Sequence, residues 1–226
     1  MNNINSWTKK AIEGTHSPQN RFFPSEIMLR ILFSSSYSGT AVIVKPGMRI
    51  LDVGALHGGN FPPFADRGCH CFGIEVNEEM ASIARQAAAN WGIDAKISVG
   101  TNRSIPFEKE SFDILTSVNT IHYEDSVLNV SNALKEYKRC LRPGGVAFVI
   151  TAAPEHFARK SAERLEANQY RLNIDDFRVG QVMSYFEDEK QLREICKAHF
   201  TNVATGRITE RHKCRNLDFY YALLTV

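Results

Sequence analysis

The sequence predicts an α/β fold with a doubly wound, mostly parallel seven-stranded sheet, a terminal antiparallel strand and helices on both faces. Three observations predict it. Short apolar segments of strand type alternate with amphipathic segments of helix type as far as residue 151. A glycine-containing turn at residues 54–60 follows the first of these strands. Two strand-like segments close the chain without a helix between them, so we expect them to pair antiparallel at the end of the sheet.

The first elements are a helix and the strand that leads into the glycine turn. Pro24 and Ser25 form a typical helix start, and an amphipathic run at 26–33 follows them. Residues 48–53, Met-Arg-Ile-Leu-Asp-Val, are apolar enough to predict a buried strand.

The middle of the chain continues the alternation. After the second strand, Met80, Ala84 and Ala87 share one face of a predicted helix at 77–91. Gly144 follows the next helix and separates it from another strand. The remaining elements of this region are strands at 69–75, 95–99, 112–118 and 146–151 and a helix at 126–141.

The segment at 152–185 interrupts this alternation. A helix is expected at 157–169, and many of the side chains from there to residue 186 are apolar or aromatic. Because a wound sheet closes without such an insertion, we expect a substrate cap, and the alternative is a helix packed on the sheet. The last elements expected are a helix at 187–198 and strands at 200–209 and 217–226.

Composition limits the classes of function. The chain has 226 residues, 43% of them hydrophobic, and a net charge of +2, which favours one soluble globular domain and no nucleic-acid partner. Five cysteines without a C-x-x-C pair predict neither a disulfide framework nor a zinc site, and no other metal-ligand cluster is apparent. The N-terminus lacks the pattern of a signal peptide and no apolar run reaches membrane-spanning length, so we expect a cytoplasmic protein without a membrane partner.

The glycine turn carries the most informative motif. Asp52 ends the first strand, and Gly54 and Gly58 follow it. Glu75 ends the next strand, about 20 residues after the turn, where a carboxylate reaches ribose hydroxyls in wound sheets. The glycine order does not fit G-x-G-x-x-G, and Asp52 would repel a diphosphate but attract a cationic amino group. These features favour an adenosyl amino acid over a dinucleotide.

Four blocks of sequence carry a family resemblance. They are Ile50 to Gly59, Gly73 to Asn77, Gly100 to Phe107 followed by Ser111-Phe112-Asp113, and Leu141-Arg142-Pro143-Gly144-Gly145. In order and spacing they resemble the class I methyltransferases, especially the small-molecule group. The resemblance implies S-adenosylmethionine as cofactor and methyl transfer to oxygen or nitrogen of a small-molecule substrate. It also implies a single domain over 1–226, with an N-terminal helical segment at 1–33, a cofactor-binding core at 48–151 and the cap at 152–185.

The resemblance also implies residue roles. Asp52 would lie near the methionine ammonium group, Glu75 would hold the ribose hydroxyls, and Val76 would pack on adenine. The other implied cofactor contacts are Gly54, Ala55 and Gly58 along the turn, Thr101 and Asn102 beside adenine, and Ser117 at the methionine end. The chain departs from the family pattern at Leu56, where a glycine is common.

Methyl acceptors are expected beside the segment that follows the fourth strand. His122 is the first candidate for a catalytic base, since imidazole titrates near neutral pH, and Tyr123 is a second catalytic candidate. Packing of His122 at a helix start is the structural alternative. His156 follows the fifth strand, and Arg178 is among the cap residues that could meet an anionic substrate.

Two other functions stay open at this point. One is methylation of RNA or protein, against which the mild charge argues. The other is a non-catalytic protein that retains the fold, which the leucine at position 56 favours. Oligomeric state is not predicted by any feature of the sequence.

Overall fold

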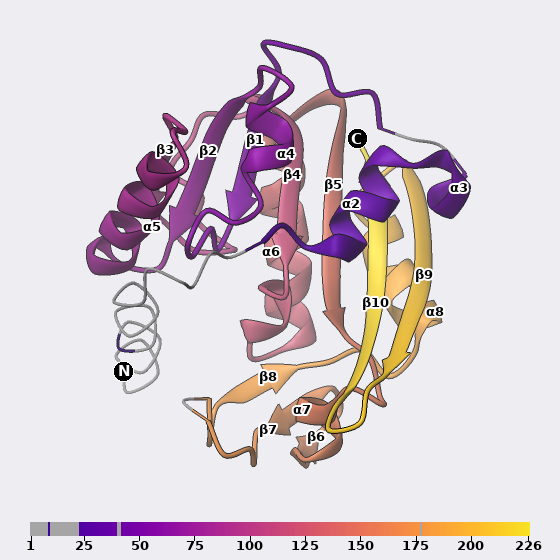
Figure 1. Ribbon diagram of the computed structural model, residues 1–226. Helices are drawn as coiled ribbons and strands as arrows, with labels where there is room; N and C mark the ends of the chain where they lie inside the picture. The colour runs from indigo at the N-terminus through magenta and orange to yellow at the C-terminus, as the bar shows by residue number, and fades with distance from the viewer. Residues whose placement is uncertain (1–8, 10–22, 40–41, 177) are drawn as a thin grey trace.

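A central sheet of seven strands organises the molecule (Figure 1). The computed structural model describes residues 9, 23–39, 42–176 and 178–226. The strand order is β3-β2-β1-β4-β5-β10-β9, and β10 runs antiparallel to both of its neighbours while the other pairings are parallel. This confirms the predicted fold class. The strands are β1 (Arg49–Val53), β2 (His70–Glu75), β3 (Lys96–Val99), β4 (Phe112–Val118), β5 (Leu141–Ala152), β9 (Asn202–Arg211) and β10 (Asn216–Thr225).

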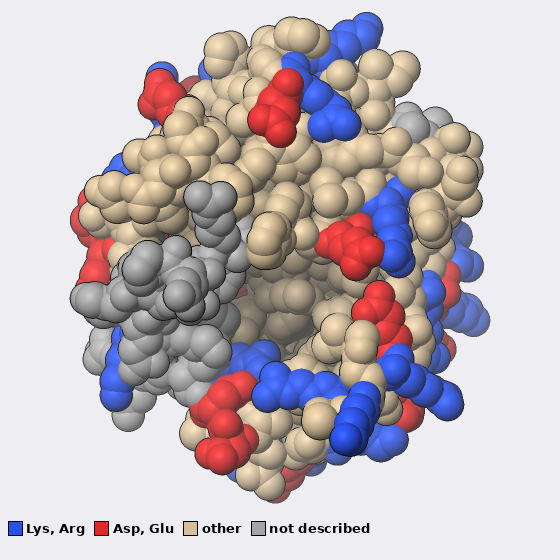
Figure 2. All heavy atoms as spheres, viewed as in Figure 1, with Lys and Arg blue, Asp and Glu red and all other residues tan. Residues whose placement is uncertain are grey.

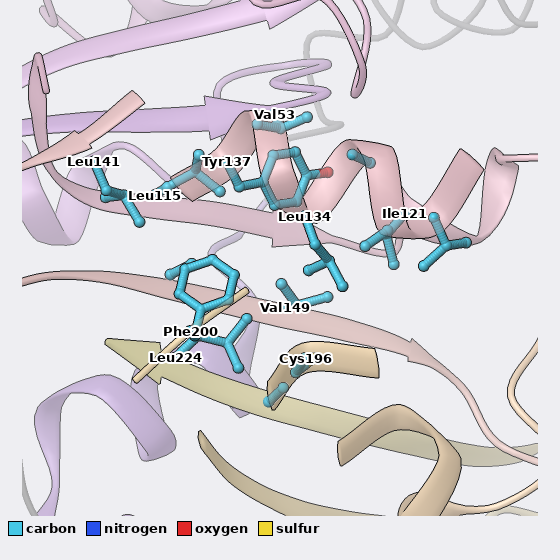
Figure 3. Packing of buried hydrophobic residues seen from close by; sticks show 14 of the residues in the cluster. Val53, Leu115, Ile121, Leu134, Tyr137, Leu141, Val149, Cys196, Phe200 and Leu224 are labelled. Carbon is cyan, nitrogen blue, oxygen red and sulfur yellow. The ribbon is translucent and has the colours of Figure 1, made fainter. Parts of the chain in front are cut away.

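Helices cover both faces of the sheet, as predicted. Side chains of α6 (Val127–Cys140) and α8 (Glu189–Lys197) join one buried apolar cluster, and those of α2 (Glu26–Phe33), α4 (Pro62–Ala65) and α5 (Glu78–Asn90) join the other. Figure 3 shows Leu134 and Tyr137 of α6 in the first cluster, packed with Leu115 and Val149 of the sheet. Two short helices, α3 (Ser35–Ser38) and η1 (Ile121–Tyr123), complete this part of the chain.

The helix starts follow from capping side chains. The Asn77 side chain accepts a hydrogen bond from the Met80 amide at 2.8 Å at the start of α5. Ser126 and Asp188 do the same at the starts of α6 and α8. Each cap satisfies one of the backbone donors that a first helical turn leaves without a partner, so the sequence fixes where these helices begin.

Residues 152–185 form a cap whose structure differs from the prediction. The expected helix at 157–169 is wrong: α7 (Phe157–Lys160) is one turn long, and a separate three-stranded sheet follows it. In Figure 1 this small sheet lies beyond the carboxyl ends of the central strands. Its strands are β6 (Glu163–Glu166), β7 (Gln169–Arg171) and β8 (Val182–Ser184).

Tertiary contacts explain why the cap is not helical. Asn168 adopts a left-handed backbone with φ of 67°, which makes the turn between β6 and β7. Its side-chain amide donates to the Tyr185 carbonyl oxygen at 2.7 Å. Tyr170 then packs against the Tyr185 ring in a buried cluster of the cap. Local helix propensity is weak, and these contacts override it.

The strand order of the central sheet indicates where a ligand site lies. The strand order reverses between β1 and β4, and the carboxyl ends of those strands face the cap. Open α/β sheets bind ligands at this point because the loops diverge there and leave a crevice. No helix among the described residues is long and apolar enough to cross a membrane.

Candidate functional site

A cavity of about 670 Å³ lies at the carboxyl ends of β1, β2 and β4. Its opening is the hollow at the centre of the face in Figure 2. Residues of the central sheet line one part, which we call the cofactor half. His122, Tyr123 and residues from the cap and from the start of β10 line the other part, which we call the acceptor half. A cavity of this size accommodates a small ligand.

Glu75 lies in the wall of the cofactor half. It ends β2, is 5% exposed, and its Oε1 accepts from the Leu56 amide at 2.6 Å. Its Oε2 accepts from the Val76 amide at 3.3 Å. Burial raises the pKa of Glu75, and these two backbone hydrogen bonds oppose that rise. The carboxylate is therefore held in a fixed position at the cavity wall, with acceptor capacity left for a diol.

The turn after β1 brings backbone to the cavity. Gly54 has φ of 75°, and a Cβ there would lie 2.9 Å from the Thr120 side chain. Leu56 also has a positive φ, 46°, and its side chain lines the cavity. Ala55 lines an adjoining cavity of about 400 Å³, and Gly58 lies behind the turn against Phe61.

Asp52 lies beneath the turn and does not line either cavity. It is 1% exposed and accepts from the Thr116 hydroxyl at 2.7 Å and from the Asn60 amide at 3.1 Å. Burial raises the pKa of Asp52 to about 7, more than these hydrogen bonds lower it, and the nearby Glu75 adds to the rise. Asn60 lines the adjoining cavity, so it joins Asp52 to the surface where a cationic amino group would bind.

A buried polar network backs the other end of the cofactor half. Asn102 and Thr101 line the cavity after β3. The Asn102 amide oxygen accepts from the Tyr137 hydroxyl at 2.6 Å, and its amine donates to Glu124 at 3.1 Å. The Tyr137 hydroxyl also bonds Ser117, which is fully buried and does not line the cavity. The Asn102 amide oxygen, which the sequence predicted to lie beside adenine, therefore already accepts from a protein group. Val118 and Asn119 line the cavity wall beside Ser117.

The cofactor half fits an adenosyl group. The buried carboxylate of Glu75 matches the two hydroxyls of a ribose. Val76, next to it, is 43% exposed although apolar, and lines the cavity with Ile74 and Met80. An apolar surface beside a ribose-binding carboxylate is what a flat adenine ring requires. Gly54 lines the same cavity, and the absence of a side chain there makes room for Thr120.

His122 and Tyr123 form η1, at the boundary of the acceptor half. His122 is 5% exposed, and its Nδ1 lies 3.1 Å from the Thr151 hydroxyl. Burial, with smaller effects of the neighbouring His156 and Arg178, lowers the pKa of His122 to about 3. Burial raises the pKa of Tyr123, while Arg178 opposes that rise. At neutral pH the imidazole and the phenol are both uncharged.

The cap and β10 supply the rest of the acceptor half. His156 follows β5, and burial together with Arg178 lowers its pKa to about 4, against the opposing charge of Asp218. The cap contributes Arg178, Gln181 and Tyr185, and β10 contributes Phe219. The sequence patterns did not single out Gln181, which precedes β8, or Phe219 of β10, because tertiary packing brings both to the cavity.

Metal-ligand chemistry does not stand out in the described part of the chain. No group of three or more His, Cys, Asp or Glu side chains is placed there to hold an ion. The chemistry that the cavity offers is that of hydrogen bonds, neutral imidazoles, carboxylates and two guanidinium groups.

Comparisons with known proteins relate residues 51–149 to methyltransferases. Residues 51–149 match the model of the family described as methyltransferase domain. The chain is 30% identical over 105 residues to a ubiquinone biosynthesis O-methyltransferase of Sinorhizobium fredii, covering 46% of this chain and 41% of that protein. It is 29% identical over 208 residues to a sterol 24-C-methyltransferase of Schizosaccharomyces pombe, covering 90% of this chain and 53% of that protein. The chain thus spans about half the length of these curated relatives.

A solved structure shows the same fold. The SAM-dependent methyltransferase from Methanosarcina mazei superposes with a TM-score of 0.65 over 80% of this chain and 93% of that chain, at 17% sequence identity. At that sequence identity the structural likeness shows the fold, and the match to the family model relates residues 51–149 to methyltransferases. The cofactor of the family is S-adenosylmethionine, as the four sequence blocks predicted. Residues 51–149 therefore match a methyltransferase domain, and the fold is that of S-adenosylmethionine-dependent methyltransferases of known structure.

Proposed function

We propose that this protein transfers the methyl group of S-adenosylmethionine to an oxygen or nitrogen of a small-molecule acceptor. One observation carries the proposal: a single cavity joins the ribose-type carboxylate of Glu75 to a chamber lined by His122 and Tyr185. A methyltransferase needs this continuity, because the donor and the acceptor must meet in line without intervening water. The names of the two curated relatives include an O-methyltransferase and a C-methyltransferase, which supports a small acceptor.

The cofactor would supply an electrophilic methyl group on its sulfonium sulfur. An acceptor lone pair would then bond to the methyl carbon as the carbon–sulfur bond breaks and a neutral thioether leaves. The residues of the chain position the two partners. Glu75 holds the ribose, and the turn at Gly54 and Leu56 guides the methionine portion toward the acceptor half. The neutral His122 imidazole can accept a hydrogen bond from the acceptor's nucleophile at Nε2, because its Nδ1 is engaged by Thr151. With a pKa of about 3, His122 is too weak a base to hold the proton of a phenol or an ammonium group, so it orients the acceptor and the proton passes to solvent.

Thermal unfolding with added ligands tests the proposal. S-adenosylmethionine and S-adenosylhomocysteine should each raise the Tm and NADH should not, because a ligand selective for the native state stabilises it by about 2.7 kcal/mol at 100 times its Kd. Glu75→Gln should weaken S-adenosylhomocysteine binding about tenfold or more, since it removes the charge on the ribose partner. Glu79→Gln, at an exposed residue in the first turn of α5 that does not line the cavity, is the matched control.

Two results would contradict different parts of this proposal. Equal affinities of the Glu75→Gln and Glu79→Gln variants would remove Glu75 from the binding site. No Tm rise with either adenosyl ligand at saturating concentration would contradict the proposed function and favour a non-catalytic protein with this fold.

A further inference from the structure

The charged groups of the cavity are unevenly distributed. Glu75 lies in the cofactor half, and Arg103 and Glu124 pair with each other at 2.7 Å on the same side. Asp125 is exposed, and its carboxylate accepts from Asn129 at the start of α6. Among the described lining residues this leaves Arg178 as the charged side chain of the acceptor half.

Arg178 lines the acceptor half as one member of an ion pair with Asp176. Its Nη2 lies 2.7 Å from Asp176 Oδ2, and its Nε lies 3.1 Å from Asp176 Oδ1. Arg178 lines the cavity, whereas Asp176 does not. The Arg178 guanidinium also hydrogen-bonds Tyr123, and its charge lowers the pKa of both His122 and His156. Arg178 therefore acts electrostatically on the whole acceptor half.

A second cation lies behind the chamber wall. Arg159 is 6% exposed, and it donates to the Phe186 carbonyl oxygen at 2.6 Å and to the Tyr170 hydroxyl at 3.3 Å. Its guanidinium stacks over the rings of Tyr170 and Tyr185. No carboxylate within ion-pair distance of Arg159 belongs to the described residues. A buried cation held by neutral groups adds positive potential to the chamber.

The remaining walls are apolar and flat. Phe157, Tyr185 and Phe219 line the chamber, and the Arg178 guanidinium lies over the Phe157 ring at 5.9 Å. His122 and His156 add two uncharged imidazoles that can donate or accept one hydrogen bond each. The chamber therefore combines aromatic surface, neutral hydrogen-bonding groups and two nearby guanidinium groups, of which that of Arg159 has no carboxylate partner among the described residues.

We propose that the methyl acceptor is a carboxylate-bearing small molecule with an apolar or aromatic body, whose carboxylate binds Arg178 while its nucleophile faces His122. This rests on the proposed function. A carboxylate can accept from the guanidinium donors of Arg178 that Asp176 does not engage, and a partly buried site makes a charge-assisted hydrogen bond stronger than it would be in water. Arg178 is then the residue that selects anionic acceptors over neutral ones of the same shape.

Binding of matched probes tests the proposal. Wild-type protein saturated with S-adenosylhomocysteine is titrated calorimetrically with 3-hydroxybenzoate, 4-hydroxybenzoate and indole-3-carboxylate, each beside its primary amide. Each carboxylate that binds should do so about tenfold or more tightly than its amide, because a hydrogen bond to a charged group contributes more than one to a neutral group. The preference should weaken with added salt.

Variants connect the preference to one residue. Arg178→Gln should remove most of the preference for carboxylates, and Arg178→Lys should retain part of it because the charge stays without the fork. Arg164→Gln is the control, since Arg164 is an exposed cap arginine that pairs with Glu187 and does not line the cavity. A second readout is the pKa of His156 by NMR, which a bound carboxylate should raise as it offsets Arg178; the other charged neighbour of this imidazole, Asp218, is the same in both states.

The contrary results are distinct from a failure of the proposed function. The inference is overturned if amides bind as tightly as carboxylates, if no carboxylate of the panel binds at millimolar concentration, or if Arg178→Gln keeps the preference. Binding of S-adenosylhomocysteine is measured first and alone. If it fails, the proposed function fails, and the same carboxylate and amide titrations on the ligand-free protein still decide the role of Arg178.

Discussion

At the scale of single residues, Leu56 shows how the site departs from the family pattern. The turn needs a left-handed backbone at this position, and the chain meets that need with a leucine at φ of 46°. A left-handed conformation costs an L-residue about 1–2 kcal/mol, which glycine avoids. The Leu56 amide nevertheless makes the 2.6 Å hydrogen bond that fixes Glu75. The strain is thus located where the backbone must approach the ligand.

Two substitutions separate this strain from the packing of the side chain. Leu56→Gly and Leu56→Ala remove nearly the same contacts, but only glycine relieves the positive φ. We expect the glycine variant to have a free energy of unfolding about 1 kcal/mol higher than the alanine variant, measured by urea denaturation. Affinity for S-adenosylhomocysteine should change alike in both. Equal stability of the two variants would show that the leucine is not strained in solution.

At the scale of elements, the cap depends on one turn residue. Asn168 joins β6 to β7, donates to the Tyr185 carbonyl oxygen, and exchanges hydrogen bonds with Gln191 of α8. It therefore ties the cap to both the acceptor half and the central domain. Its positive φ and its side-chain contacts are separate contributions, because asparagine tolerates the left-handed region better than most residues.

Substitution of Asn168 should loosen the cap without unfolding the sheet. Asn168→Ala loses both the side-chain bonds and the tolerance for positive φ, while Asn168→Gly loses only the bonds. Hydrogen exchange should show reduced protection of β6, β7 and β8 in the order wild type, glycine variant, alanine variant, with β1 and β4 unchanged. A uniform loss of protection over all strands would mean that the cap and the sheet unfold as one unit.

At the scale of the whole molecule, buried titratable groups give the stability opposing pH dependences. Asp52 has a folded-state pKa near 7, so ionisation in the unfolded state lowers stability as pH rises from about 4 to 7. His122 and His156 have folded-state pKa values of about 3 and 4, below the usual 6.5. Between about pH 4 and 6.5 these two imidazoles are protonated in the unfolded chain but not in the folded protein. Their contribution to the free energy of unfolding is therefore lost as pH falls.

Removal of both histidines should leave the pH dependence that Asp52 causes. His122→Asn combined with His156→Asn keeps a polar atom near each Nδ1 position but removes the titration. The free energy of unfolding, measured between pH 4 and 7, should then rise less steeply with pH than in the wild type, by up to about 1.4 kcal/mol per pH unit for each histidine removed. An unchanged slope would show that the two imidazoles titrate in the folded state as they do in the unfolded chain.

Sequence alone determined the order of the central elements and the cofactor half. Strand and helix periodicities, the caps at Asn77 and Ser126, and the spacing from Asp52 to Glu75 are local features, and they specify structure through the backbone nearby. These features also sufficed for the family and the cofactor. The assignment of single residues to the cofactor stays a prediction, and the cavity walls indicate which of them a ligand can reach.

Only the tertiary structure decided the acceptor half. The sequence from 157 to 169 has helical character, yet contacts with Tyr185 and Gln191 make most of it a hairpin. The bond from Tyr137 to Asn102 joins residues 35 positions apart and gives the amide oxygen a protein partner. The low pKa of His122 arises from burial beneath the cap, and Arg178 faces the cavity because the cap folds over it. Burial and charge at this site are set by segments distant in sequence, which no local pattern encodes.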